Sequence, residues 1–184
     1  MKGVGKCVAV IGSSYISPDT KAYADAGKTG YELAKAGYAV MTGGGFGLME
    51  AVNKGAQKAG GKSIGVFVKY KNNYPQNDFV DKEYNIVLSS ISARKELFQK
   101  MATAFVALPG GFGSLDEITE CIALMQVNEI ERRPMILQDR SFWLPAITWT
   151  KQVLKNEYNV INDEDMAFIH LTDNVERTLA VIGS

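Results

Sequence analysis

Cysteine, histidine and net charge are all scarce in this sequence. Its 184 residues include two cysteines, Cys7 and Cys121, whose separation fits neither a metal-ligand motif nor a disulfide framework. We interpret both as small apolar residues of a core. The single histidine, His170, has no constellation of serine, cysteine or carboxylate around it in the sequence, so we interpret it as structural. No metal site is predicted.

Neither sign of charge is in excess, because twenty basic and twenty acidic residues give a formal net charge of zero. A protein of this kind has no overall field that attracts nucleic acid or an anionic membrane, and we expect neither as a partner. Any phosphate group has to be bound by local features.

Long apolar runs are also missing. No segment approaches the roughly 20 apolar residues of a membrane helix, and the apolar run near the N-terminus is too short for a signal peptide. We therefore expect a cytoplasmic protein. The composition, 46% hydrophobic and 22% charged, is ordinary for a globular protein, and without any linker or repeat it predicts one domain over residues 1–184.

Short apolar runs alternate with helical patterns along the whole chain. Strands are predicted at residues 7–11, 38–41, 63–68, 84–88, 104–108 and 134–137. Helices are predicted from 19 to about 37, from 48 to about 59, and at 92–102, 114–128, 142–155, 163–166 and 174–182. At least six alternations predict an α/β fold: a Rossmann-like, doubly wound parallel sheet with helices on both faces.

The most informative stretch is residues 104–120, in which an apolar strand runs into a glycine turn that opens a helix. Gly110, Gly111 and Gly113 let a ligand approach the main chain, and a helix that starts near Ser114 aims free N–H groups at the same point. This arrangement predicts an anion site. An alternative reading is that Ser114 caps the helix and Glu117 completes a capping box. The residues of this stretch leave both readings open.

Two other stretches accompany this turn. Residues 42–50 form a second strand–glycine–helix junction, in which Gly44 and Gly45 are candidate ligand contacts. A dinucleotide fingerprint would need an acidic residue about 20 positions further on, and the sequence does not place one. Arg94 and Lys95 lie near the start of a predicted helix, where positive charge opposes the helix dipole, which favours an anionic partner for them.

The loop after the first strand and one long polar loop complete the candidates. Ser13 and Ser14 follow a strand whose carboxyl end meets the ligand edge of a doubly wound sheet, so they are candidate contacts to a ribose or phosphate. Solvent-facing hydroxyls are the alternative. Residues 69–82 are too polar and irregular for a regular element, and we predict a lid there.

Together, PGGFGSLDE, GGGFGLM and the Arg-Lys pair resemble the family often labelled "lysine decarboxylase-like", better known from the plant LONELY GUY enzymes. Those enzymes are phosphoribohydrolases that act on cytokinin nucleoside monophosphates. The resemblance covers nearly the whole chain, from the opening VAVIGSS to a tail similar to that of the common bacterial branch. It implies hydrolysis of an N-glycosidic bond to a free base and ribose 5-phosphate, and a homodimer through helices that flank the site, with the predicted helix 114–128 as a candidate.

Residue by residue, the resemblance implies that Arg94 and Glu117 are the catalytic pair. It also implies that Gly110, Gly111, Gly113 and Ser114 bind the phosphate, with Ser13, Ser14, Gly44, Gly45 and Lys95 as further substrate contacts. The plant-type pattern has Met and His where this chain has Ile91 and Ser92, and Thr where it has Ser114. Adenosine monophosphate is therefore as good a candidate substrate as a cytokinin nucleotide.

The same motifs are compatible in principle with two other functions. A pyridoxal-dependent lysine decarboxylase would need a Schiff-base lysine with cofactor partners, which are not recognisable here, so we expect no cofactor. A carrier that binds a nucleotide-like ligand such as the molybdenum cofactor, without cleaving it, could use the same turns. The Arg94 and Glu117 pair favours the hydrolase, because a pure carrier does not need it.

Overall fold

The computed structural model describes residues 4–69 and 76–183 of the chain. Within these residues, seven strands form one sheet in the order β4-β3-β2-β1-β5-β6-β7, and every neighbouring pair is parallel. The strands are β1 (Cys7–Ile11), β2 (Ala39–Thr42), β3 (Ser63–Val68), β4 (Asn85–Leu88), β5 (Ala102–Ala107), β6 (Met135–Gln138) and β7 (Ile169–Thr172). The predicted fold class is confirmed.

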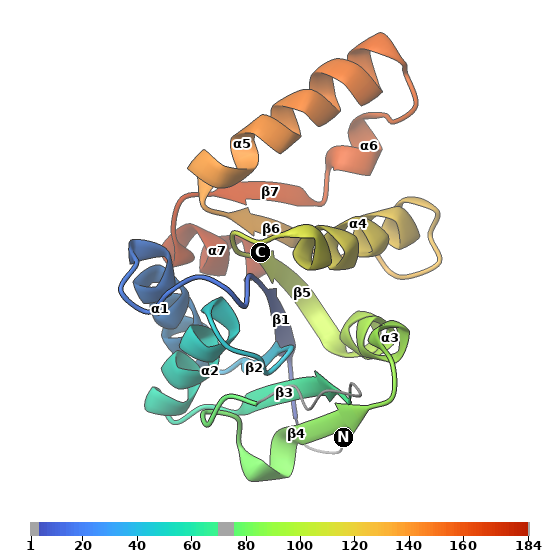
Figure 1. The fold of residues 1–184 in the computed structure, drawn as a ribbon. Helices are drawn as coiled ribbons and strands as arrows, with labels where there is room; N and C mark the ends of the chain where they lie inside the picture. The colour runs from blue at the N-terminus through green and yellow to red at the C-terminus, as the bar shows by residue number, and fades with distance from the viewer. Residues whose placement is uncertain (1–3, 70–75, 184) are drawn as a thin grey trace.

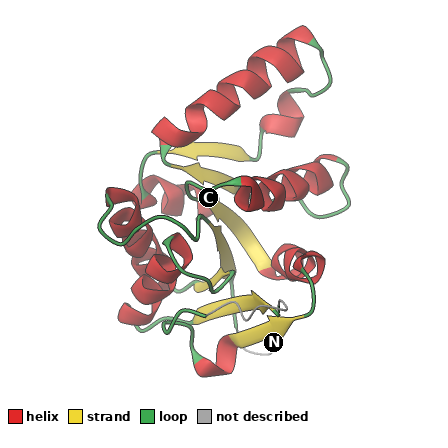
Figure 2. Ribbon diagram, viewed as in Figure 1, coloured by secondary structure: helices red, strands yellow, loops and turns green. Residues whose placement is uncertain are grey.

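Helices cover both faces of this sheet (Figure 1; Figure 2). One face carries α1 (Lys21–Lys35), α2 (Leu48–Lys58) and α7 (Val175–Ile182), and the other carries α3 (Ile91–Met101), α4 (Phe112–Gln126) and α5 (Arg140–Trp149). Three shorter pieces are η1 (Lys82–Tyr84), η2 (Thr150–Glu157) and α6 (Asp163–Met166).

The central strand β1 is apolar along its whole length because both of its faces are covered. In β1, Val8 and Val10 pack with α1 and α2, whereas Cys7, Ala9 and Ile11 pack with α3 and α4. Cys7 and Cys121 are both buried free thiols, as predicted, and burial raises the pKa of each to about 12. Both cysteines therefore behave as apolar core residues.

The chain reverses its direction of sheet building beside β1. It runs outward from β1 to β4, then crosses back to place β5 on the other side of β1. The loops after β1, β2 and β5 therefore meet at one carboxyl edge, as predicted for the two glycine turns. Backbone hydrogen bonds join them, from the Ser13 N–H to the Pro109 carbonyl at 3.0 Å and from the Leu48 N–H to the Ser13 carbonyl at 2.9 Å. Ligands of open α/β sheets bind at such a switch point.

Some predicted elements were wrong in extent or missing. The edge strand β7, which holds His170, was not predicted, because its side chains are only partly buried and give a weak pattern. The predicted helix 142–155 starts earlier, at Arg140, and widens from Thr150 into the π-helix η2. None of the helices in the described residues is long and apolar enough to cross a membrane.

Candidate functional site

A cavity of about 540 Å³ lies at the switch point. Its polar wall comes from the loop after β1, which contributes Ser13 and Ser14, and from the turn after β5, which contributes Gly111, Gly113 and Ser114. Gly43 and Gly45 of the turn after β2, together with Arg94 and Glu117, close the inner side. The structure thus brings most of the predicted site residues to one cavity.

The helix α4 begins earlier than predicted, and no side chain caps the N–H groups of its first turn. Because Gly111 is the N-cap residue, Phe112 is the first helical residue and Ser114 the third. Gly111 makes no side-chain cap hydrogen bond. The alternative reading, in which Ser114 caps the helix and Glu117 completes a capping box, is therefore wrong. Without a side-chain cap, the N–H groups of the first turn are left for a ligand, and they carry the positive end of the helix dipole.

Arg94 of α3 and Glu117 of α4 form an ion pair in the cavity wall. Their side chains are only 20% and 11% exposed. Burial raises the pKa of the Glu117 carboxyl above its ordinary value, and the positive charge and hydrogen bond of Arg94 oppose that rise. The capping reading gave Glu117 a partner on its own helix, whereas the structure gives it one on the neighbouring helix.

Three predicted contacts, Lys95, Gly110 and Gly44, do not line the cavity. The ammonium of Lys95 lies 3.0 Å from Asp116 and 3.3 Å from Glu120, so its anionic partners are carboxylates of α4. Gly110 lies against the Ser114 side chain, and a Cβ there would come within 2.2 Å of the hydroxyl oxygen. Gly44 lies over the ring of Phe67. The structure does not bring these residues into the lining of the cavity.

The first glycine turn is more constrained than the second. Gly44 and Gly47 have φ of +70° and +62°, a conformation that side chains other than glycine rarely adopt. The first N–H of α2, at Leu48, is already satisfied by the Ser13 carbonyl. This turn therefore shapes the cavity, whereas the turn before α4 offers free donors.

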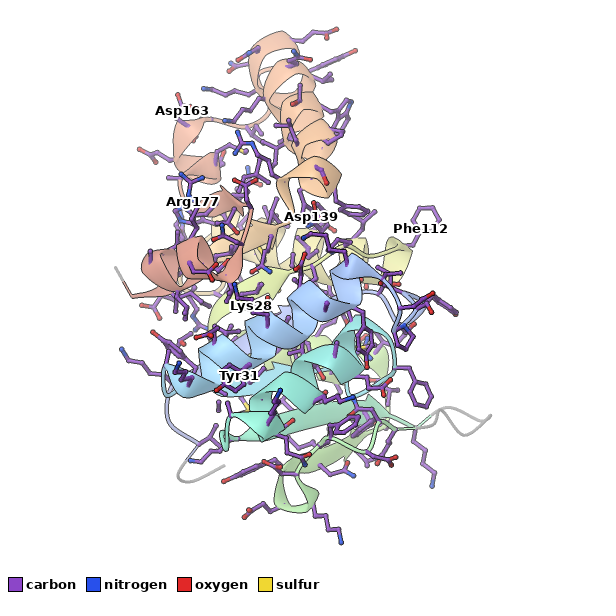
Figure 3. The ribbon with its side chains drawn as sticks, turned by 90° about the vertical axis from the view of Figure 1, so that its left-hand side faces the viewer. Lys28, Tyr31, Phe112, Asp139, Asp163 and Arg177 are labelled. Atoms are coloured by element: carbon purple, nitrogen blue, oxygen red, sulfur yellow. The ribbon has the colours of Figure 1, made fainter. Side chains whose placement is uncertain are left out.

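The sequence reasoning missed the apolar part of the cavity. Phe67, Val68 and Ile91 line it from β3 and the start of α3, and Met49 lines it from α2. At the mouth, Tyr15 and Phe112 are 88% and 91% exposed. Figure 3 shows Phe112 projecting outward from the start of α4. A signal existed for Phe112, since both glycine turns carry a phenylalanine between two glycines, at positions 46 and 112.

The predicted lid at residues 69–82 is only partly tested, because residues 70–75 lie outside the described residues. The described remainder includes Asn77, which is buried and hydrogen-bonded to the first glycine turn, and η1. Asn77 thus ties the described end of this loop to the first glycine turn.

Comparisons with known proteins agree with this picture. A family model described as "Possible lysine decarboxylase" matches residues 49–182. A cytokinin riboside 5'-monophosphate phosphoribohydrolase from Mycobacterium marinum is 34% identical over 96 residues, which span 52% of this chain and 51% of that protein. The match thus covers about half the length of this curated relative.

Solved structures give the same fold. The X-ray structure of the structural genomics target TM1055 is 25% identical, has a TM-score of 0.75 and covers 97% of this chain and 98% of that one. The molybdenum cofactor binding protein from Rippkaea orientalis, 22% identical with a TM-score of 0.73, covers 97% and 95% and shows likeness of fold alone. On the family match over most of its length, the chain belongs to the family described as possible lysine decarboxylases, which includes the LONELY GUY phosphoribohydrolases.

Proposed function

We propose that this protein hydrolyses the N-glycosidic bond of a purine or cytokinin nucleoside 5'-monophosphate. Water adds to the anomeric carbon of the ribose, the bond to the base breaks, and the products are the protonated free base and ribose 5-phosphate. The observation that carries this proposal is a buried ion pair, Arg94 with Glu117, in the same cavity as an uncapped helix start. The Mycobacterium marinum relative bears the name of this activity.

The phosphate would bind at the start of α4. Glycines at 111 and 113 leave open space, since a Cβ at either position would meet nothing within 4 Å. An anion there would receive backbone N–H groups and the positive end of the helix dipole. The hydroxyl of Ser114, on the cavity wall, is a further donor.

Glu117 would act on the sugar. Glycosidic cleavage passes through an oxocarbenium-like ribose, which a nearby carboxylate stabilises or supplies with an activated water. Arg94 would keep the carboxylate ionised in its buried setting, because a guanidinium within contact distance favours the charged form. Arg94 would also orient the phosphoribosyl group.

The base would occupy the apolar part of the cavity, formed by Phe67, Val68 and Ile91 with Met49. These side chains fit a flat ring without selecting its polar edge, so adenosine monophosphate and cytokinin nucleotides are both proposed substrates. Free nucleosides are expected to be poor substrates, because they lack the group that the helix start binds.

A carrier of a nucleotide-like ligand is the second candidate function, favoured by the likeness of fold to the molybdenum cofactor binding protein. The same cavity would hold such a ligand. The carrier has no use for a carboxylate beside the anomeric carbon, so the two functions differ in what Glu117 does.

The deciding experiment is a base-release assay over adenosine monophosphate, cytokinin riboside monophosphates and the matching nucleosides. Release from monophosphates but not from nucleosides is the expected result. Binding of monophosphates without release would favour the carrier. Asp116→Asn is the matched control for Glu117, since Asp116 is an exposed carboxylate of the same helix that pairs with Lys95 outside the cavity lining.

A homodimer through α4 is also proposed. Leu115 of this helix and Val127, the residue that caps its C-terminal end, are 37% and 69% exposed, and Phe112 at its start is 91% exposed. Sedimentation or light scattering at micromolar concentration measures the assembly. A monomer in both the wild type and a Val127→Ser variant would reject the proposal, whereas a dimer weakened by Val127→Ser would support it.

A further inference from the structure

A buried polar network lies beneath the first glycine turn. Asn77 is only 5% exposed, and its side-chain Nδ2 donates to the carbonyl oxygens of Gly44 and Gly45 at 2.9 Å each. The backbone N–H of Asn77 also donates to the Gly44 carbonyl, at 3.0 Å. One residue from the loop before η1 thus makes three hydrogen bonds to a turn that lines the cavity.

The network continues into the sheet. The Oδ1 atom of Asn53, on α2, accepts from Asn77 Nδ2 at 3.1 Å and from the Thr42 hydroxyl at 2.6 Å. The Thr42 oxygen accepts in its turn from the Gly44 N–H at 2.9 Å. The N–H and the carbonyl of Gly44 are therefore both fixed, and a buried polar network that is fully paired is rigid.

This turn supports the guanidinium of Arg94. A Cβ placed at Gly43 would lie 3.3 Å from Arg94 Nη1 and 3.7 Å from Cζ, so the guanidinium packs on the Gly43 backbone. The Nε atom of Arg94 is buried and, within residues 4–69 and 76–183, has no hydrogen-bond partner. The position of the guanidinium therefore depends on Glu117 and on packing against the turn.

We propose that Asn77, acting with Thr42 and Asn53, is a positioning residue that holds the first glycine turn against Arg94 and so sets the geometry of the Arg94–Glu117 pair. The importance of this role for catalysis rests on the proposed function. Asn77 does not touch the reacting atoms, and its effect travels through the carbonyls of Gly44 and Gly45 to Gly43. Displacing a positioned group by about 1 Å can slow a reaction on the order of a hundredfold.

A second buried network provides a matched control on the same face of the sheet, at its opposite end, among α1, β6, β7 and α7. Thr178 of α7 donates to Gln138 Oε1 at 2.9 Å and lies 3.0 Å from the Thr172 hydroxyl, and Gln138 donates to Thr29 at 2.7 Å. Thr42 and Thr178 are both 0% exposed. Replacing either by valine keeps the shape and removes one buried hydroxyl, but only Thr42 connects to the first glycine turn.

The test compares Asn77→Ala, Thr42→Val and Thr178→Val with the wild type, each well below its melting temperature. In the first measurement, kcat and KM for adenosine monophosphate are determined per folded protein. We expect kcat to fall on the order of tenfold to a hundredfold in the first two variants and to change less than about twofold in Thr178→Val. All three are expected to melt at lower temperature, so loss of stability alone does not separate them.

The second measurement is hydrogen exchange of the Arg94 Nε–H, followed by nitrogen-15 NMR, which does not depend on activity. We expect faster exchange in Asn77→Ala and Thr42→Val, and wild-type exchange in Thr178→Val. If Asn77→Ala fails to fold, both measurements are made on Thr42→Val. Wild-type exchange and kcat in the variants of the first network, or equal changes in Thr178→Val, would overturn the proposal. If the wild type releases no base from any monophosphate, the proposed function falls, while the exchange measurement still decides the role of Asn77.

Discussion

The same short motif, Gly-Phe-Gly, occurs in both glycine turns, at residues 45–47 and 111–113, and its two copies have different roles. In the first turn, Gly47 has positive φ, and a Cβ there would lie 2.6 Å from the Ser13 carbonyl oxygen. In the second turn, Gly111 has φ of −95°, and a Cβ on Gly111 or Gly113 would meet nothing within 4 Å. The backbone conformation requires glycine at position 47, whereas open space for a ligand explains Gly111 and Gly113.

The helices that follow the two motifs differ in the same way. Aligned on Gly-Phe-Gly, Ser114 and Glu117 of α4 correspond to Leu48 and Ala51 of α2. Leu48 and Ala51 are 0% and 1% exposed and pack into the core, whereas Ser114 and Glu117 line the cavity. A glycine motif at a helix start is therefore no sufficient sign of a ligand site. The polar residues one turn into the helix distinguish the two copies.

The largest expected effect is a loss of folding stability when a glycine of the first turn, but not of the second, is replaced by alanine. Gly44→Ala forces a methyl group to within 2.3 Å of the Phe67 ring at φ of +70°. Left-handed strain and overpacking together are expected to cost about 2–5 kcal/mol, a fall in melting temperature on the order of 10 °C. Thermal unfolding followed by circular dichroism measures it.

Gly111→Ala is the control for this change. Its backbone conformation suits alanine and its Cβ position is open, so we expect a loss of stability below about 1 kcal/mol, from the weaker N-cap alone. Its affinity for a monophosphate should nevertheless fall, because the added methyl group enters the cavity. Equal melting temperatures for the two variants would remove the distinction between the turns.

The next largest effect concerns Glu117, the acidic residue that stands where α2 has Ala51. Glu117→Gln keeps the size of the side chain and removes its charge. If the carboxylate faces a developing positive charge, kcat should fall on the order of a hundredfold or more, with little change in ligand affinity. Steady-state kinetics and calorimetric binding measure the two quantities. Wild-type turnover in Glu117→Gln, or an equal loss in Asp116→Asn, would count against the assignment.

Ser114→Ala tests the hydroxyl that stands where α2 has Leu48. Removing one donor to a charged phosphate should weaken monophosphate binding by about 1–2 kcal/mol. The affinity for the corresponding nucleoside should stay unchanged. A loss of the same size for both ligands would place the hydroxyl away from the phosphate.

The smallest predicted effect is the pH dependence of the site. Burial raises the pKa of Glu117 above its ordinary value of 4.5, with Arg94 opposing the shift. In the proposed mechanism the carboxylate must be ionised, so activity should be lost as the pH falls through this raised pKa, at a higher pH than for an exposed glutamate. The pH profile of kcat measures it. In Glu117→Gln the residual kcat should no longer fall at low pH. If it still falls as in the wild type, a group other than Glu117 causes the loss of activity.

Much of the fold follows from local pattern. The apolar stretches at residues 7–11, 63–68 and 104–108 predict buried parallel strands, because a strand covered on both faces has no polar side. The edge strand β7 escaped prediction for the opposite reason, since its side chains are only partly buried. The start of α4 was predicted at Ser114 because serine is a strong N-cap residue, yet the chain uses Gly111 there.

For the candidate site, the sequence by itself determined the chemical groups: two glycine turns at helix starts, a serine, a basic pair and a row of carboxylates. It could not determine which carboxylate each cation pairs with. Arg94 and Lys95 are adjacent, yet the packing of α3 on α4 directs one to Glu117 in the cavity and the other to Asp116 and Glu120 outside its lining. Such a choice depends on how two helices pack when the paired residues are 23 positions apart in the sequence, and only the tertiary structure decides it.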